Sequence, residues 1–516
     1  MPRVNLTNSK SSLSRIVSAS AASWVRIIIT IVTQLTLVPL YLSNWTPEEY
    51  GAWLLLQATW AVITSLDMGH QDYVGYECLR LGTNNRIEIA RAIFSAAPIA
   101  LLITLIDIFF IFVLGKTGLT EKWMNHDIEI ASEWQAALLL QATTFFFTAS
   151  IGGLIVRGLA PFGHFPRIAW WGTINALFTS IVPGIAVSLG ANLWEAMVAL
   201  CAANISYYII HLADMIRIMR LESFFQARPQ FKLGFSQGGK SLWLILKSLA
   251  EVGRQQGVRI LLAPLAGVAD MAAFSTMRTG ANFAMQGLNT ITGPIMPELM
   301  RYLVARDQQR TEGAFSVVWL VICIGLSPAV LIVQYFAPEF FPIWTHGKIT
   351  FDPWVFGMLS VGILLAALVQ PAVAVILGNN IVRTQLYISL LGALITIGAL
   401  LMLVPLYKIR GAALALLLAE IVNLLAYQLV ATRWLRKNNM SWPWRAFLTA
   451  FASVIIAGIG MAVLAATPSN NLEFLLMILL AEATVTVVYW HALPQIARKR
   501  ALELTKRFKP KPSKHI

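Results

Sequence analysis

Several charged side chains lie within apolar stretches of this sequence that are long enough to cross a membrane. Five are basic and one is acidic, and the set comprises Arg26, Lys247, Glu251, Arg254, Arg259 and Arg278. A charged side chain at the centre of a bilayer costs about 2.5–3.5 kcal/mol on the insertion scale, so it persists mainly where it faces an interior cavity. Because the charges are mostly positive, and because Arg binds phosphate through paired hydrogen bonds, we expect the cavity to hold a phosphate-containing anion.

The spacing of these residues places them on single faces of three helices. In the stretch 241–263, Lys247, Glu251 and Arg254 share a face with Gln255 beside it, and Glu251 is spaced to pair with both cations. One Glu cannot neutralise two cations, so a net positive charge remains. The stretches 273–296 and 19–42 each carry a similar polar row: Ser275, Arg278, Asn282, Gln286 and Asn289 in the former, and Ser23, Arg26, Thr30, Thr33 and Gln34 in the latter.

Two interpretations of the polar rows remain open. Together they would line one aqueous cavity, but uncharged polar side chains also hold membrane helices together. Arg26 could extend its guanidinium to the membrane surface, and Arg259 and Lys247 lie near opposite surfaces. From the first interpretation we expect a set of substrate-binding residues: Arg254, Arg278, Arg26, Lys247, Glu251, Gln255, Asn282 and Gln286.

Acidic residues within the apolar stretches are few and separated in sequence. The candidates for ion coupling, each isolated, are Asp67, Asp107, Glu420 and Glu482. Asp67 directly precedes Met68 and Gly69 where the second stretch ends, so we expect it to cap a helix or lie at the membrane surface. Three scattered cysteines form no metal-binding pattern, and the phosphate-binding loop of ATP-driven proteins is missing. We expect neither a metal nor a cofactor.

These residues are set in a chain that is apolar along its whole length. Of its 516 residues, 57% are hydrophobic and 12% charged, with a mean hydropathy of +0.67; soluble proteins carry about 25% charged residues. Apolar stretches of about 20 residues, the length that spans a bilayer, recur throughout. We therefore expect an all-α integral membrane protein with about 14 transmembrane helices, at 19–42, 51–68, 93–114, 134–156, 168–188, 193–213, 241–263, 273–296, 314–336, 354–377, 385–405, 411–432, 445–466 and 471–493.

Basic residues predict the orientation of the chain. Lys and Arg outnumber Asp and Glu by 39 to 25, and most of them fall in alternate loops and near the two ends. Because loops rich in Lys and Arg stay in the cytoplasm, we expect a multi-pass protein of the cell inner membrane with both termini cytoplasmic. Lys408 and Arg410 depart from this pattern, since they fall in an external turn.

The longest cytoplasmic connection divides the chain into six stretches before it and eight after. We expect an N-terminal lobe at 1–213, a linker at 214–240, a C-terminal lobe at 241–440, an extra helix pair at 441–495 and a basic cytoplasmic tail at 496–516. The external loops are short, which leaves no place for the catalytic loop or soluble domain of a membrane polymerase or glycosyltransferase. We expect a transporter and not an enzyme.

Several short motifs resemble a known family. Residues 38–42 (VPLYL), 48–53 (EEYGAW) and 66–69 (LDMG) are similar to the start of polysaccharide flippases, which carry O-antigen and other lipid-linked oligosaccharides. These flippases belong to the multidrug/oligosaccharidyl-lipid/polysaccharide exporter superfamily. Residues 278–282 (RTGAN) through 297–299 (PEL) resemble the family's eighth helix, and 404–407 (VPLY) with 411–414 (GAAL) resemble its turn between the eleventh and twelfth helices.

The resemblance implies two pseudo-symmetric six-helix lobes around a central cavity that opens alternately to each side. It also implies a polyprenyl-pyrophosphate-linked oligosaccharide as substrate, for the biosynthesis of cell-surface polysaccharide or lipopolysaccharide, with a polysaccharide polymerase and glycosyltransferases as partners in the lipid bilayer. No nucleic acid is expected. Two alternatives remain. One is a small-molecule or drug exporter of the same superfamily, which acidic residues in the first half's cavity would mark, and the other is a membrane glycosyltransferase or polymerase.

Overall fold

The computed structural model describes residues 9–82, 85–124, 127–292, 295–379, 381–467, 472–493 and 498. All regular secondary structure in these residues is helical. Contacts between Cα atoms divide the chain into two compact units, Met1–Ser275 with Trp344–Ile349, and Thr276–Ile343 with Thr350–Ile516. The basic tail expected at 496–516 lies outside the described residues, apart from Arg498.

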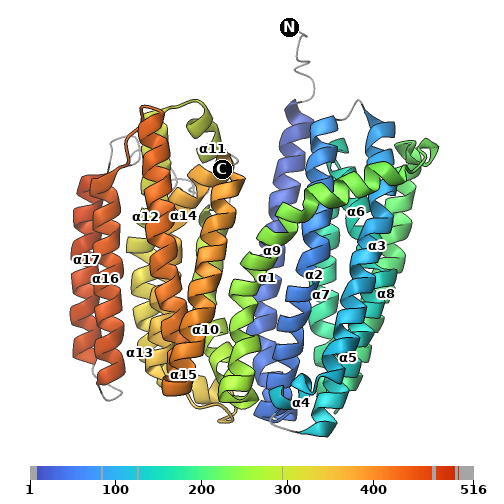
Figure 1. The fold of residues 1–516 in the computed structure, drawn as a ribbon. Coiled ribbons are helices and arrows are strands. Elements are labelled where there is room, and N and C mark those ends of the chain that lie inside the picture. The colour runs from blue at the N-terminus through green and yellow to red at the C-terminus, as the bar shows by residue number, and fades with distance from the viewer. Residues whose placement is uncertain are drawn as a thin grey trace, which may run out of the picture. The chain divides into compact units, whose positions relative to one another are not determined.

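The helices of the first unit are mostly long and pack side by side (Figure 1). Their bounds are α1 Ser9–Asn44, α2 Pro47–Leu81, α3 Arg86–Lys116, α4 Leu119–Trp123, α5 Ile128–Phe147, α6 Ala149–Leu159, α7 Phe165–Ser188, α8 Leu193–Leu221 and α9 Phe231–Ala266. Before α2, the Thr46 hydroxyl accepts from the Glu49 N–H while the Glu49 carboxylate accepts from the Thr46 N–H. This capping box satisfies N–H groups that the start of a helix leaves free.

Helix α9 packs along α2 and α3 at two glycines. A side chain at Gly69 of α2 would lie 2.5 Å from the Cα of Ile245, and one at Gly234 of α9 would lie 2.1 Å from the carbonyl oxygen of Ser95. The helices approach this closely because a glycine leaves the backbone uncovered. The whole of α9 belongs to the first of these two units.

The second unit contains most of α10 (Val268–Thr292), which begins in the first, and the helices that follow it. These are α11 Ile295–Val304, α12 Gln308–Val321, the π-helix η4 Ile322–Leu326, α13 Ser327–Trp344, α14 Pro353–Gly378, α15 Val382–Lys437, α16 Trp444–Ala466 and α17 Leu472–Ala492. A π-helix closes its hydrogen bonds over five residues instead of four and is rare. Here it interrupts an otherwise α-helical run that extends from Gln308 to Trp344.

The expected extra helix pair, α16 and α17, packs into the core of the second unit. Trp442, just before α16, and Phe447 within it contact Trp319 of α12, with ring centroids 5.5 and 5.6 Å away. On α17, the Thr486 hydroxyl donates to the carbonyl of Cys323 in η4 at 3.0 Å. The pair is therefore a structural part of this unit.

Each of the fourteen expected stretches coincides with helix in the described residues, which confirms the all-α membrane fold. The stretches 385–405 and 411–432 both lie in α15, which turns sharply at Lys408, where φ is 47° and ψ is −127°. The stretch 134–156 is broken between α5 and α6, which diverge by 41°. Nine helices of the described residues are long and apolar enough to cross a membrane, or up to ten with the bent pair. The helices α2, α9 and α10 are too polar to be among them.

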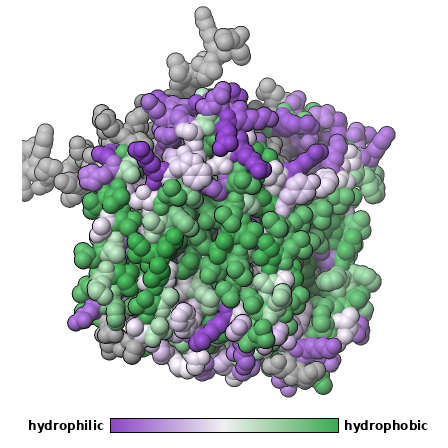
Figure 2. Space-filling model, turned by 60° about the vertical axis from the view of Figure 1, so that its left-hand side comes forward, coloured by the Kyte–Doolittle hydropathy of each residue, from purple (hydrophilic) through white to green (hydrophobic). Residues whose placement is uncertain are grey.

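Hydrophobic side chains cover the middle of the helices visible in Figure 2, and hydrophilic ones gather at the ends, most densely at the upper end. Large apolar residues are exposed on several helices, among them Phe109 (66%), Ile209 (66%) and Leu480 (70%). Extended apolar surface of this kind marks contact with a membrane or another protein. With the length of the helices, it fits a multi-pass membrane protein.

Candidate functional site

The basic face of α9, formed by Lys247, Glu251 and Arg254, is turned away from the helix against which α9 packs. Ile245 lies against Gly69 of α2, and successive residues of an α-helix are rotated by about 100°. Lys247 and Arg254 therefore project roughly 180–200° from Ile245. Both are half-buried, whereas Glu251 is exposed. The helix thus presents positive charge on a side that α2 does not cover.

The ion pairs expected on this face do not form among the described residues. Neither Lys247 nor Glu251 has an ion pair or hydrogen bond there, so the pairing predicted from spacing was wrong; Arg254 and Gln255 each interact with another group. Exposed pairs four residues apart on a helix contribute only about 0.3–0.5 kcal/mol, so their spacing alone does not hold them together. The charge of Lys247 is consequently not neutralised by Glu251.

Arg259, further along α9, forms hydrogen bonds within α9 and to the start of the next helix. Its Nε donates to the Ser275 hydroxyl at 3.1 Å and its Nη1 donates to Gln256 Oε1 at 3.2 Å. Ser275 belongs to the part of α10 that lies in the first unit. The guanidinium therefore connects α9 to the start of α10, which supports the interhelical-contact interpretation for this residue.

Helix α1 contributes Arg26 to the predicted set. Its guanidinium is exposed, and Nη1 comes within 4.0 Å of the position that a side chain would occupy at Gly172 of α7. Thr30 and Thr33, expected beside it, donate their hydroxyl protons to carbonyls four residues back in the same helix, at 2.8 and 2.7 Å. Such bonds are local to the helix. The two threonine hydroxyls are therefore satisfied within α1, and Arg26 supplies the charge of this polar row.

The second unit holds the remaining predicted residues, Arg278, Asn282 and Gln286. Being four residues apart on α10, they share one face. Gly280, about 200° from Arg278 around the helix, lies against Phe356 of α14, whose ring is 3.4 Å from the position of a side chain there. The face therefore points away from Phe356. Arg278 and Gln286 are half-buried and Asn282 is exposed. The other five predicted residues are in the first unit.

A cavity of about 230 Å³ within the first unit was not anticipated from the sequence. Helices α2, α5, α6, α7 and α8 line it, and its polar lining residues include Gln71, Arg157, Tyr208 and His211. Arg157 lies on α6, where Nε and Nη2 donate to one oxygen of Asp72 at 2.9 and 2.7 Å. The cavity is therefore partly cationic.

Gln71 connects this arginine to a buried acid. Its Oε1 accepts from Arg157 Nη1 at 2.7 Å, and its Nε2 donates to Asp67 Oδ2 at 2.6 Å. Asp67 has no exposed surface and lies in the interior of α2, which continues to Leu81. The expectation that Asp67 caps a helix or lies at the surface was wrong. The four-residue spacing of Asp67 and Gln71 was the signal in the sequence that could have revealed the pair.

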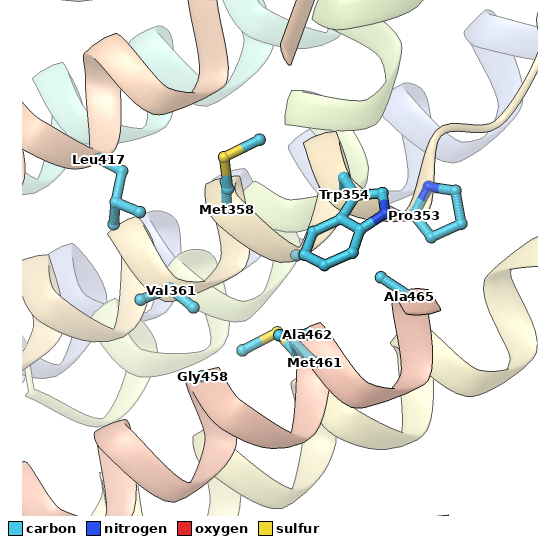
Figure 3. Close-up of a pocket in the computed structure, with 10 residues that line it drawn as sticks. Pro353, Trp354, Met358, Val361, Leu417, Gly458, Met461, Ala462 and Ala465 are labelled. Carbon is cyan, nitrogen blue, oxygen red and sulfur yellow. The ribbon is translucent and has the colours of Figure 1, made fainter. Parts of the chain in front are cut away.

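The second unit contains an apolar crevice of about 280 Å³ between α14, α15 and α16. Figure 3 shows Trp354, Met358 and Val361 of α14 on one side and Met461 and Ala462 of α16 on the other. The indole of Trp354 carries the one N–H donor among the lining side chains, and the others are apolar and uncharged, so the crevice suits a hydrocarbon chain better than a sugar or an anion.

The fold is similar to those of several solved membrane transporters. A structure of the lipid II flippase MurJ in an inward closed conformation is similar over 91% of this chain and 97% of that chain, with a TM-score of 0.62 and 12% identity. An inward-facing multidrug resistance MATE family transporter is similar over 79% of this chain and 98% of that chain, with a TM-score of 0.62 and 14% identity. A mutant of the Vibrio cholerae MATE transporter VcmN is similar over 84% of this chain and 98% of that chain, with a TM-score of 0.55 and 14% identity.

No protein-family model matches the sequence, and no curated protein matches it. The similarity to solved structures therefore concerns the fold. The similar structures are of transporters and flippases.

Proposed function

We propose that this protein is a flippase that moves a polyprenyl-pyrophosphate-linked oligosaccharide across the cell inner membrane by alternating access. The observation that carries the proposal is the basic face of α9, where Lys247 and Arg254 project on the side of the helix that α2 does not cover. Ionisable residues within membrane-spanning helices mark the path of a substrate or ion. A pyrophosphate offers two phosphate groups, which arginine binds through paired, charge-assisted hydrogen bonds.

In this proposal the two kinds of polar residue have different roles. The cations bind the pyrophosphate: Arg254, Arg278, Arg26 and Lys247. The other members of the predicted set hydrogen-bond the sugars: Glu251, Gln255, Asn282 and Gln286. The lipid chain remains in the hydrocarbon of the bilayer, for which an apolar crevice such as that in Figure 3 is suited.

The proposal includes an orientation and a cellular context. With both termini cytoplasmic, the ends of α2 and α3 that carry Arg80 and Arg86 face the cytoplasm, as the bias of basic residues predicts; the side chain of Arg80 is 76% exposed. The substrate then enters from the leaflet where glycosyltransferases assemble it. A polysaccharide polymerase uses it on the other side, in the biosynthesis of cell-surface polysaccharide.

Export of a cationic small molecule is the second candidate, because buried carboxyl groups do exist in the first unit. Asp67 and Asp107 are 0% and 3% exposed. However, the cavity beside them is lined by Gln71 and Arg157 and not by either acid. A cationic ligand in that cavity would meet an arginine already paired with Asp72 and neither buried acid, which favours the flippase.

Mass spectrometry of lipid extracts from cells that lack this protein tests the proposal. We expect a complete polyprenyl-pyrophosphate oligosaccharide to accumulate, and its glycan to remain inaccessible to probes added outside the cell. Intact surface polysaccharide without such accumulation would contradict the flippase and favour small-molecule export.

A further inference from the structure

The first half of α9 crosses α3 and α2 instead of running along them (Figure 1). At its start the Gln230 N–H donates to the Ser95 hydroxyl of α3 at 2.8 Å, and further along Ile245 lies against Gly69 of α2. Between these two contacts the helix advances by about 22 Å, which is about twice the distance between the axes of packed helices.

The two contacts lie at nearly the same level of the first unit. His70, which follows Gly69, has its Nε2 3.4 Å from the carbonyl oxygen of Ala96, which follows Ser95. These positions of α2 and α3 are therefore side by side. It follows that α9 changes level little while it passes from one helix to the other.

This level is close to the membrane surface expected at the turn between α2 and α3. On α3, Arg91 pairs with Glu88 at 2.6 Å and is followed by a long uncharged run that contains Ser95. On α2, the side chain of Asp72 is 44% exposed and lies about one turn from Gly69. The first half of α9 therefore lies about one turn inside the last exposed charges, where lipid headgroups meet hydrocarbon.

The side chains of this segment form three faces. Gly234, Gln237 and Ser241 are buried on the side that meets α3 and α2. An apolar flank is rotated by about 60–120° from Gly234, and its exposed members are Phe231 (70%), Phe235 (69%), Leu242 (56%) and Leu246 (48%). A polar flank is rotated by about 160–240°, and its exposed members are Lys232, Ser236 and Lys240.

A helix with one apolar and one basic flank is typical of a segment that lies in the plane of a membrane surface. Trp243 is 63% exposed beside the lysines, and tryptophan is enriched at this depth of a membrane. Lys232 and Lys240 have neither an ion pair nor a hydrogen bond among the described residues. The same holds for the exposed Arg228 just before the helix. Three positive charges are therefore available to a ligand at this surface.

We propose that Phe231–Leu246 is an interfacial helix that binds the headgroups of anionic phospholipids through Lys232, Lys240 and Arg228. The nearest acid before α9, Glu222, does not compete for these cations, because it pairs with Arg86 at 3.2 Å and contacts His164 at 3.4 Å. A lipid fits better than an acidic protein, since it supplies a negative headgroup for the polar flank and hydrocarbon for the apolar flank at one surface. The inference does not depend on what the protein transports.

Native mass spectrometry of the full-length protein, extracted from bilayers of phosphatidylcholine and phosphatidylglycerol, tests the binding. We expect phosphatidylglycerol to be retained in preference to phosphatidylcholine. Lys232→Gln and Lys240→Gln should each weaken its retention by about fivefold, the typical effect of one basic residue near an anionic surface. Lys232→Arg combined with Lys240→Arg keeps both charges and should retain the lipid.

A matched pair of substitutions separates this site from a general loss of charge. Arg80→Gln combined with Arg310→Gln also removes two basic residues, but Glu77 and Asp307 already pair with them, so retention should be unchanged. Equal losses in this control and in the double lysine variant overturn the proposal. A wild-type protein that retains the two lipids equally also overturns it.

The in-plane orientation is tested separately by spin labels on the two flanks. The native cysteines Cys78, Cys201 and Cys323 are buried, so a label can be directed to Phe235→Cys or to Ser236→Cys. In bilayers, the label at 235 should be accessible to oxygen dissolved in the hydrocarbon, and the label at 236 to a water-soluble nickel chelate. Equal accessibility of the two labels to both reagents would show that the segment does not lie in the interface, which overturns the proposal.

These outcomes are independent of the transport experiment. Absence of a lipid-linked intermediate in cells without the protein defeats the flippase and leaves the phospholipid result valid. Undiminished retention of phosphatidylglycerol by the double lysine variant defeats the interfacial site and leaves the flippase standing.

Discussion

The carboxylate of Glu482 accepts a hydrogen bond of 2.7 Å from the hydroxyl of Ser453, and both residues are completely buried. This bond joins α17 to α16, and the same hydroxyl lies 3.0 Å from that of Ser327 at the start of α13. Apolar sequence places these helices in the membrane, but the polar contact determines which sides of them meet. Glu482 was a candidate for ion coupling from the sequence, and its hydrogen bond indicates a structural role.

Replacing Glu482 should destabilise the second unit. Glu482→Ala removes one of the two partners of the buried Ser453 hydroxyl, the other being Ser327, so we expect a loss of about 1–3 kcal/mol, seen as a lower temperature of thermal unfolding in detergent. Glu482→Gln keeps an acceptor and should lose less. Glu473→Ala, at an exposed position in the first turn of the same helix, serves as the control. Unfolding of Glu482→Ala at the wild-type temperature would refute the structural role.

Arg254 should be required for transport of a phosphate-bearing lipid. Hydrogen bonds to a charged group contribute about 1.5–3 kcal/mol, so Arg254→Ala should weaken pyrophosphate binding by roughly tenfold or more, and the lipid intermediate should accumulate. Arg254→Lys keeps the charge without the paired geometry and should retain part of the activity. Arg310→Ala, on a side chain that is 62% exposed, should export normally.

The outcome for the double variant decides whether the basic faces matter. Normal glycan export by Arg254→Ala combined with Arg278→Ala, at wild-type protein levels, would exclude a pyrophosphate site on α9 and α10.

Gly69 should be intolerant of substitution, because α2 and α9 meet there. In Gly69→Ala the added methyl would lie 2.5 Å from the Cα of Ile245, so a backbone must shift, at a cost of about 1–3 kcal/mol. Gly253→Ala is the matched control within α9, where no atom lies within 4 Å of the added methyl. It should be neutral or stabilise the helix by roughly 0.5–1 kcal/mol. Equal unfolding temperatures for the two variants would contradict the close approach.

Arg410 and Asp352 should contribute unequally to stability. Their ion pair is 2.7 Å long, and the arginine side chain is 56% exposed, so Arg410→Ala should cost less than about 1 kcal/mol. Asp352 also accepts from the N–H groups of Trp354 and Val355 at the start of α14. Asp352→Ala should therefore cost about 1 kcal/mol more, the typical value of a helix cap. Both variants lose the ion pair, but only Asp352→Ala loses the helix cap. The difference between their free energies of unfolding, measured by denaturation in the same detergent, should therefore equal the contribution of the cap.

The helical part of this structure could be predicted from the sequence because each membrane span is specified locally. A run of about 20 apolar residues needs no distant contact to be helical in a bilayer. The departure at Lys408 and Arg410 is different, since the charge of Arg410 is compensated by Asp352, 58 residues away in sequence. The turn within α15 lies where the basic residues interrupt the apolar pattern.

The polar interior could be predicted only in part, because its geometry depends on contacts between distant segments. The positions of Lys247 and Arg254 on one face follow from helical periodicity. The environment of Asp67 does not, since Gln71 meets Ser150 from a helix 79 residues away in sequence. Likewise, the packing of α9 on α2 requires Gly69 and Ile245 to meet, and no periodicity indicates which residues of two helices face each other.

The π-helix η4 has a consequence for how the second unit tolerates changes in length. Because a π turn contains one residue more than an α turn, deleting a single residue from Ile322–Leu326 would let the run from Gln308 to Trp344 become regular α-helix. The half beyond the deletion would keep nearly the same orientation relative to the half before it, because the same turn would then be made with one residue fewer. The carbonyl that Thr486 now reaches at Cys323 would regain a helical donor. A one-residue deletion within η4 should therefore leave α13 aligned with α16 and α17, whereas a one-residue deletion in the regular helix on either side would rotate α13 by about 100° and misalign it.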